Sequence, residues 1–277
     1  MEIRNLPDRE SYQRMTTDEL RKAFLLEGMF VPDQISMLYS DEDRAIVGGA
    51  VPANAPLHLA PSKREMAAEY FAERREIGVV NLGGDGVIRT DGKESMLQAK
   101  DMLYVARGVR DIEFASARPD APAIFYFVSF PAHAVHPVTK ARYAEADKTV
   151  LGSAGGANRR TIRKYIHSGG VKSCQLVMGL TELDEGSVWN TMPPHTHVRR
   201  SEIYLYAGLS EDALVVHLMG APDRTRSLIV RNLQGVVSPS WSIHCAAGTA
   251  KYLFVWAMGG ENQEFSDQDA VSMRALM

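Results

Sequence analysis

Short apolar runs rich in β-branched and aromatic residues, separated by glycine, proline and charged residues, make up most of this chain. They are IGVVNLGG, GVIRTDGKE, DMLYVARG, AIFYFVSF, SCQLVMGLTEL, SEIYLYAG, DALVVHLMG, RSLIVRN, GVVSPSW and KYLFVWAMGG. Runs of this length, bounded by turn residues, are typical of β-strands. The pattern therefore predicts an all-β protein built as an antiparallel sandwich or barrel.

Helical patterns are few and lie near the two ends of the chain. Thr16 and Glu19 have capping-box spacing ahead of an apolar stripe, and Gly28 follows it, so we expect a helix from Thr16 to Gly28. A second short helix is predicted from Asp267 to Leu276, with Ser266 as its cap.

A stretch rich in glycine, alanine and serine near the middle of the chain predicts a linker. It is DKTVLGSAGGAN, residues 147–158. The two halves also resemble each other, because ERREIGVVNLGG aligns with RRSEIYLYAG, with Glu76 aligned to Glu202. The sequence therefore predicts two copies of one β-barrel unit, residues 1–150 and 151–277.

Composition narrows the class of protein. Of 277 residues, 45% are hydrophobic and 23% charged, as in ordinary globular proteins, and the net charge of -3 offers no general attraction to nucleic acid or anionic membranes. No apolar stretch approaches the roughly 20 residues that span a bilayer, and the first residues lack an apolar signal region. With only two cysteines, we expect a cytoplasmic protein without disulfides.

One group of residues predicts a metal site. His195 and His197 are two positions apart, so their imidazoles leave the same face of an extended segment. Glu202 has the opposite parity and joins them only if the chain turns between residues 198 and 201. His244 follows several strands later in SPSWSIH. Three imidazoles and one carboxylate suit a divalent transition metal with positions left for water or substrate.

Isolated histidine pairs more often have a structural role, and the other histidines fit that interpretation. His217 alternates with apolar residues in DALVVHLMG and is expected to be packed or hydrogen-bonded, and the remaining four lack partners at ligand spacing. We therefore take only His195, His197, Glu202 and His244 as candidate ligands.

The segments HTHVRRSE and PSWSIH resemble the two motifs of the cupin superfamily. A wider set of blocks, FLLEGMFVPD, YSDEDRAIVGGAVP, YFAERREIGVVNLGGDG, NRRTIRKY, WNTMPPHTHVRR and GGENQ among them, is similar to the 5-keto-4-deoxyuronate isomerase family, over nearly the whole chain. The resemblance implies two tandem cupin barrels, a bicupin, with the metal motif only in the second. It also implies a cytoplasmic, zinc-dependent, hexameric ketol isomerase whose zinc ligands fall on His195, His197, Glu202 and His244.

The activity implied is the conversion of 4-deoxy-L-threo-5-hexosulose uronate to 3-deoxy-D-glycero-2,5-hexodiulosonate in pectin breakdown. Such an isomerisation passes through a cis-enediolate, whose negative oxygen a metal can stabilise. The sequence does not identify the proton-transfer base, for which Glu261 is a weak candidate. Arg160, Arg163 and Lys164 are candidates for binding the substrate carboxylate, and Tyr206 and Trp241 for lining the sugar pocket.

Two other functions remain compatible with the sequence. A cupin dioxygenase would use the same ligands with iron and would consume oxygen. A non-catalytic protein that binds sugar acids would hold the ligand without converting it. The ligand set by itself accepts zinc, manganese, iron or nickel, so zinc rests on the resemblance.

Overall fold

The computed structural model describes residues 1–277 and shows two compact units. The first comprises Met1–Arg4, Gly28–Asp147 and Tyr165–Val177, and the second comprises Asn5–Glu27, Lys148–Lys164 and Met178–Met277. Where the sequence suggested one boundary near residue 150, the chain passes between the units several times. As a result, the segment that contains the first predicted helix packs with the second unit.

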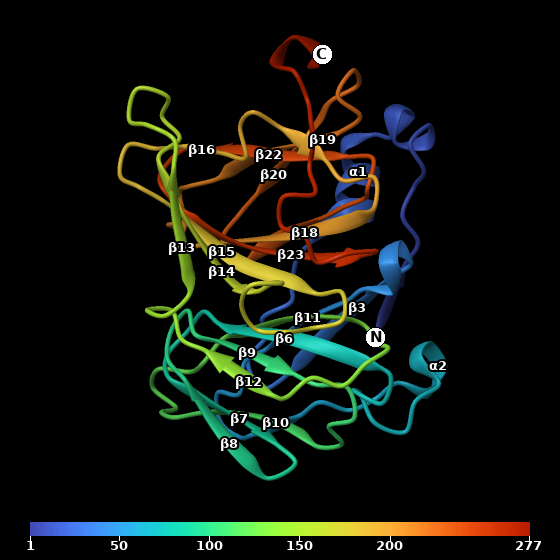
Figure 1. Ribbon diagram of the computed structural model, residues 1–277, viewed down its shortest axis with the longest axis vertical. Coiled ribbons are helices and arrows are strands. Elements are labelled where there is room, and N and C mark those ends of the chain that lie inside the picture. Colours follow the sequence, from blue (N-terminus) through green and yellow to red (C-terminus); the bar gives the residue numbers. More distant parts are fainter. The chain divides into compact units, whose positions relative to one another are not determined.

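Two sheets form the first unit, in which β6, β9 and β11 lie on one side and β7, β8 and β10 on the other (Figure 1). The larger sheet has the order β1 (Glu2–Arg4), β3 (Ile35–Ser40), β4 (Ile46–Ala50), β11 (Phe125–Pro131), β6 (Arg75–Asn81), β9 (Met102–Val105), β12 (Thr139–Ala141). The smaller has the order β5 (Leu57–His58), β10 (Ile112–Ser116), β7 (Gly86–Thr90), β8 (Lys93–Leu97).

The second unit repeats this plan. Its larger sheet has the order β13 (Asp147–Leu151), β14 (Arg160–Ile166), β15 (Val177–Leu183), β23 (Leu253–Gly260), β18 (Arg200–Ala207), β21 (Gln234–Ser238), β2 (Leu25–Leu26). The smaller has the order β16 (Trp189–Asn190), β22 (Ile243–Gly248), β19 (Val215–Gly220), β20 (Arg226–Val230). A two-stranded sheet pairs β17 (His195–Thr196) with β24 (Asp269–Ala270).

The strand order supports the internal repeat that the sequence predicted. In each unit the central strand, β6 or β18, lies between the last long strand and the strand that follows the first hairpin. The runs predicted as strands are strands in the structure, so the all-β prediction is confirmed. The alternation of buried and exposed residues in β7 and β19 is the period of two expected when one face of a sheet is covered.

The sequence alignment of the two halves is, however, one residue out of register with the sheet faces. Tyr206 is hydrogen-bonded to His217 of the smaller sheet, so Glu202, four residues earlier, faces the interior of its unit. Glu76 lies on the opposite face from Arg75, whose Nε donates to Ser129 Oγ. The buried Glu76 carboxylate instead accepts hydrogen bonds from Tyr104 and the backbone amides of residues 174–176.

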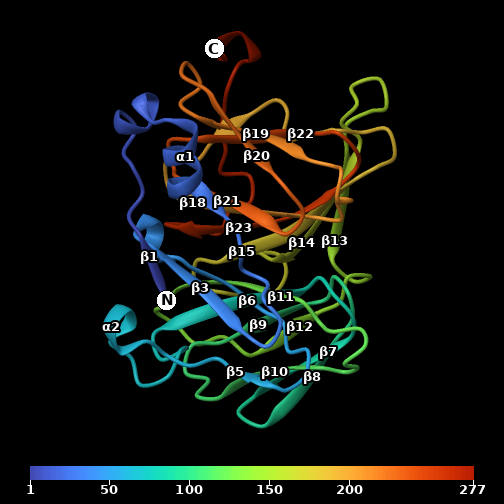
Figure 2. The same ribbon diagram turned by 180° about the vertical axis from the view of Figure 1, so that it is seen from behind.

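Helices are short. The first predicted helix is α1 (Thr17–Phe24), and Thr16 and Glu19 form the expected capping box, but the helix ends before Gly28 because Leu25–Leu26 pair with β21. The remainder are α2 (Lys63–Met66) and three 3-10 turns, Ser11–Arg14, Glu42–Arg44 and Met273–Ala275. Figure 2 shows α1 beside β20 and β21, which it contacts. None of these helices has the length and apolarity that crossing a membrane requires.

The predicted helix from Asp267 to Leu276 is wrong. Residues 269–270 form β24 and only residues 273–275 make a helical turn, which Ser272 rather than Ser266 caps. Backbone pairing of Ala270 with His195 and ion pairs from Arg199 to Asp267 and Asp269 hold this segment extended. Tertiary contacts therefore override a weak local helix preference.

Gly179, in β15, lets Trp256 pack directly on the backbone of the larger sheet. A Cβ at this position would lie 2.1 Å from the Trp256 ring and 2.5 Å from the backbone oxygen of Arg163. We predict that Gly179→Ala lowers the free energy of unfolding by about 1–3 kcal/mol, because the core has no room for the methyl group. Urea denaturation measures this. Gly155→Ala, with no atom within 4 Å of the added carbon, should change stability by less than about 0.5 kcal/mol.

Candidate metal centre

The structure brings three imidazoles and one carboxylate to one point inside the second unit. His195 Nε2 lies 3.1 Å from the Nε2 atoms of both His197 and His244. Glu202 Oε2 lies 2.8 Å from His197 Nε2 and 2.9 Å from His244 Nε2. Ligands bound roughly 2.0–2.2 Å from a transition metal are spaced about 3 Å from one another, so the four donor atoms fit a shared ion.

Three strands and one turn position these groups. His195 begins β17, and a turn closed by the Arg200 amide and the His197 carbonyl reverses the chain before β18. This turn brings Glu202 back toward the histidine pair. His244 comes from β22 in the smaller sheet, and Glu202 from β18 in the larger sheet. The site therefore lies between the two sheets of the second unit.

The hydrogen bonds of His197 leave its Nε2 atom facing Glu202, where a metal ion could bind. His197 Nδ1 lies 2.7 Å from the backbone oxygen of Asp267, which only accepts, so Nδ1 carries the proton. The Nε2 atom of His197 then faces the carboxylate of Glu202 at 2.8 Å. Because two lone-pair donors this close repel each other, a proton or a metal ion must lie between them. A backbone oxygen that orients a histidine in this way is common at metal sites.

Burial strengthens the need for positive charge next to the Glu202 carboxylate. Glu202 is 5% exposed, and His197 and His244 are 2% and 1% exposed. Burial raises the pKa of Glu202, but the charge of His244 and hydrogen bonds from both histidines outweigh it and hold that pKa well below its ordinary value. Burial, with repulsion from His244, lowers the pKa of His195 to about 2. The cluster thus offers an ionised carboxylate and a neutral imidazole, the forms that coordinate metals.

A C-terminal segment, residues 261–270, contacts His197 and the two arginines that precede Glu202. The Arg200 guanidinium is buried and donates to the backbone oxygens of Glu264 and Asp267 at 2.6 and 2.9 Å. Arg199 Nε binds both carboxylate oxygens of Asp267 at 2.8 Å. The Asp267 carbonyl accepts the hydrogen bond from His197 Nδ1. By holding Asp267 in place, these two arginines therefore fix the ring orientation of His197.

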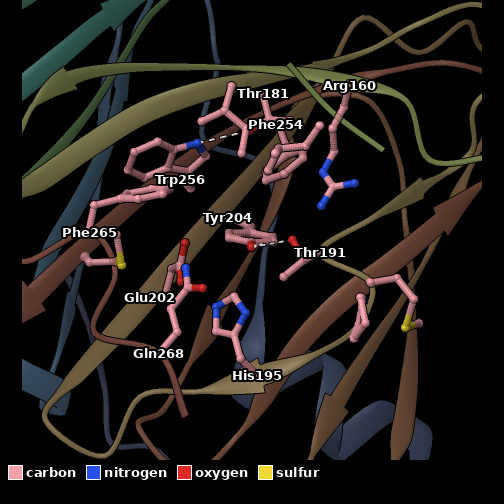
Figure 3. A pocket seen from close by; sticks show the side chains of 15 residues that line it. Arg160, Thr181, Thr191, His195, Glu202, Tyr204, Phe254, Trp256, Phe265 and Gln268 are labelled. Atoms are coloured by element: carbon pink, nitrogen blue, oxygen red, sulfur yellow. Dashed lines mark hydrogen bonds between the residues drawn. The ribbon is translucent and has the colours of Figure 1, made fainter. Parts of the chain in front are cut away.

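We call the four side chains of His195, His197, Glu202 and His244 the metal cluster. A cavity of about 170 Å³ opens beside it and extends along the larger sheet (Figure 3). Its walls include the aromatic rings of Phe254, Trp256 and Phe265. Its polar groups are Arg160, Thr181, Thr191, His195, Glu202, Tyr204 and Gln268. An apolar enclosure with a few converging polar groups is the usual form of a small-molecule site.

Of the three basic candidates from the sequence, only Arg160 lines this cavity. Its guanidinium donates to the backbone oxygen of Asn158 and has no acidic partner, and burial lowers its pKa. Arg163 Nε lies 3.6 Å from Glu182, and Lys164 lies over the ring of Phe265 at 5.3 Å. Figure 3 shows Arg160 entering the cavity with Tyr204 between it and the pair His195 and Glu202.

The other sequence candidates lie elsewhere. Tyr206 is buried and does not line the cavity. Its hydroxyl lies 2.7 Å from His217 Nδ1, so His217 is hydrogen-bonded as expected. Trp241 packs on Tyr12 with 4.7 Å between ring centroids. Glu261 is exposed and its side chain is not part of the cavity wall.

Several cavity residues were not anticipated from the sequence. Tyr204 is two positions after Glu202 on the same strand face, so the period of β18 could have found it. Its hydroxyl shares a hydrogen bond of 3.0 Å with Thr191. Gln268 and Phe265 carry no such signal, because they enter the site only through the fold of the C-terminal segment.

Comparison with known proteins agrees with this architecture. Residues 31–273 match the model of the KduI/IolB family. The chain is 50% identical to a 4-deoxy-L-threo-5-hexosulose-uronate ketol-isomerase of Caldicellulosiruptor bescii and 46% identical to the protein of that name from Bacillus subtilis. In both cases the match covers 100% of each chain.

Among solved structures, an IolB-like protein from Salmonella typhimurium superposes with a TM-score of 0.64 at 13% identity, covering 79% of this chain and 85% of that one. An oxalate decarboxylase from Lactobacillus farciminis gives a TM-score of 0.57 at 9% identity, covering 83% and 79%. At these identities the likeness is one of fold, which is cupin-like. From the match over residues 31–273 and the relatives that are similar along the full chain, this protein belongs to the KduI/IolB family.

Proposed function

We propose that this protein is a metal-dependent ketol isomerase that converts 4-deoxy-L-threo-5-hexosulose uronate to 3-deoxy-D-glycero-2,5-hexodiulosonate. The observation that carries the proposal is a cavity lined by His195 and Glu202, two of the four clustered side chains, with an arginine without an acidic partner elsewhere in its wall. The relatives named for this activity support it, since they match over the full chain. We further propose that each unit is a cupin barrel, with the metal only in the second.

The reaction moves a carbonyl group by one carbon without net change in atoms or electrons. A proton leaves the hydroxyl-bearing carbon beside the aldehyde, and a proton is added at the aldehyde carbon. Negative charge develops on oxygen in the cis-enediolate between these steps. A metal held by His195, His197, Glu202 and His244 would supply a Lewis acid for that charge.

The substrate has an aldehyde at one end and a carboxylate at the other, and the cavity has matching ends. The metal cluster lies at the end of the cavity that would take the aldehyde, and Arg160 at the end that would take the carboxylate. An arginine binds a carboxylate with two parallel hydrogen bonds, which positions the chain of carbons as well as holding it. The rings of Phe254, Trp256 and Phe265 exclude water from the space between.

Tyr204 is placed to hold a proton in the cavity. It is buried, and burial together with the charge of Glu202 keeps the pKa of its phenol well above the ordinary value. The phenol is therefore protonated at neutral pH and can donate to an oxygen on which negative charge develops. Apart from Glu202, no carboxylate lines the cavity, and its hydroxyl groups are those of Tyr204, Thr191 and Thr181.

Zinc, a hexameric assembly and a cytoplasmic location stay predictions. Zinc is our proposal for the ion because the ligand set of imidazoles and a carboxylate suits it and the family resemblance implies it. Analysis of the metal bound to purified protein tests zinc against iron, and light scattering tests the hexamer.

We expect the purified protein to convert the ketoaldehyde uronate to the ketose, followed by NMR, and to lose turnover with a chelator until metal is restored. Glu202→Gln should lower metal content and turnover by at least about a hundredfold, because the ligand charge is lost. Glu261→Gln, at an exposed carboxylate outside the cavity, should keep both. Substrate binding without conversion, or oxygen consumption, would instead support the binding protein or the dioxygenase.

Arg160→Gln should lower kcat/KM for the uronate about ten- to a hundredfold, mainly through KM, because charge-assisted hydrogen bonds to the carboxylate are lost. An analogue with a neutral group in place of the carboxylate should be converted equally by both proteins. Arg159→Gln removes a neighbouring arginine that pairs with Asp184 on the surface and is the control. Equal losses on the acid and the neutral analogue would contradict carboxylate binding by Arg160.

Tyr204→Phe should lower kcat about a hundredfold with unchanged metal content, since only the donated proton is removed. Tyr206→Phe removes a buried hydroxyl from the same strand outside the cavity and is the matched control. Steady-state kinetics and metal analysis of both variants make the comparison. If the two variants lose kcat equally, Tyr204 has no special part in the reaction.

A further inference from the structure

The first unit contains a cavity of about 210 Å³ whose lining carries a net positive charge. It is lined by Tyr39, Arg44, Glu65, Met66, Ala68, Phe71, Arg74, Arg75 and Pro131. These residues come from β3, the turn after it, α2 and the loop that follows, and facing ends of β6 and β11. Three arginines and one glutamate line the cavity, so positive charge predominates.

Arg75 is the central feature of this cavity. Its side chain is largely buried, with the residue 7% exposed, and burial lowers its pKa to about 10. The guanidinium donates to Ser129 Oγ at 3.1 Å, to the Ser129 carbonyl at 2.8 Å and to the Arg44 carbonyl. All three acceptors are neutral, and Nη1 has no hydrogen bond within the protein. Arg75 is thus a buried cation with no carboxylate in ion-pair contact.

Such an arrangement is costly unless something compensates for the charge. Removing a cation from water costs several kcal/mol when no opposite charge replaces the water. Buried arginines are accordingly found with carboxylates or phosphates, whose two oxygens match the planar guanidinium. Here Nη1, the nitrogen without a protein partner, belongs to a side chain that lines the cavity, so an anion bound there can reach it.

Two more arginines line the same space. Arg74 donates to the Ala67 carbonyl and to Glu73, and Arg44 donates to the Asp41 carbonyl. Glu65, the one acidic residue of the lining, has its nearest basic partner in Arg64 at 4.0 Å and does not pair with Arg75. With no histidine and a single carboxylate in the wall, the cavity is unsuited to a metal cation.

We propose that this cavity is a second ligand site, which binds a small molecule bearing an oxyanion, either a phosphate or a carboxylate, through Arg75 with Arg44 and Arg74 at its sides. The volume is below the roughly 300 Å³ at which sites for larger ligands begin, so the ligand is a free anion or a small acid. Phe71 and Tyr39 offer apolar surface to the rest of such a molecule. The site is independent of the metal centre and of the proposed reaction.

The test uses the full chain carrying Glu202→Gln and Arg160→Gln, which disables the site in the second unit. Calorimetry at constant ionic strength measures binding of inorganic phosphate, of D-galacturonate and of the neutral sugar D-galactose. We expect phosphate or galacturonate to bind and galactose not to bind. The two acidic probes distinguish a phosphate site from a carboxylate site, and binding of either supports the proposal.

Variants connect any binding to this cavity. Arg44→Gln with Arg74→Gln should weaken anion binding at least tenfold, because both charges line the cavity. Arg75→Lys keeps the charge but loses the fork and should also weaken it, with circular dichroism and the melting temperature showing that the protein is folded. Arg118→Gln, an exposed arginine of the same unit paired with Asp120, is the control. Absence of anion binding, or binding unaffected by the cavity variants, would overturn the proposal.

Discussion

The Glu202 carboxylate is ionised and buried, with imidazole nitrogens of His197 and His244 at 2.8 and 2.9 Å. The positions of several other residues of the second unit depend on this contact. A buried charge of this kind is stable only when opposite charge and hydrogen bonds surround it. A neutral imidazole cannot supply that charge. A metal ion held by the four side chains could supply it, and the donor set, the burial and the hydrogen bonds at Nδ1 are consistent with such a site.

The surrounding scaffold explains how such precision is reached. His244 lies on the smaller sheet and Glu202 on the larger one, so the distance between the sheets sets the size of the metal cluster. Within the larger sheet, Trp256 packs closely on Gly179 of the neighbouring strand and so has a fixed place in the cavity wall. Behind the cluster, Arg199 and Arg200 hold residues 261–270, and through the Asp267 carbonyl they hold the His197 ring. Rigid support of this type is what a reaction with developing charge requires.

The two units use one strand order for different chemistry. β6 and β18 both begin with an inward-facing arginine, Arg75 and Arg200, each opposite the end of its partner strand at Pro131 or Gly260. Arg200 donates from both terminal nitrogens to backbone oxygens of the C-terminal segment. The first unit has no such segment over Arg75, whose side chain lines a cavity instead. The same position therefore supports the candidate metal site in one unit and places a buried positive charge beside a cavity in the other.

The sequence by itself determined the β-rich character, the capped helix after Thr16 and the repeat of strands, because these depend on short-range periodicity. Spacing within a few residues indicated His195, His197 and Glu202, and the segment SPSWSIH several strands later indicated His244. Only the tertiary structure decided which arginine enters the cavity, that Tyr204 rather than Tyr206 or Trp241 lines it, and that residues 267–270 are extended. It also showed that Glu76 and Glu202 face opposite sides of their sheets. These outcomes depend on which strand face is covered and on contacts between residues more than sixty positions apart, such as Arg199 with Asp267, and no local pattern encodes them.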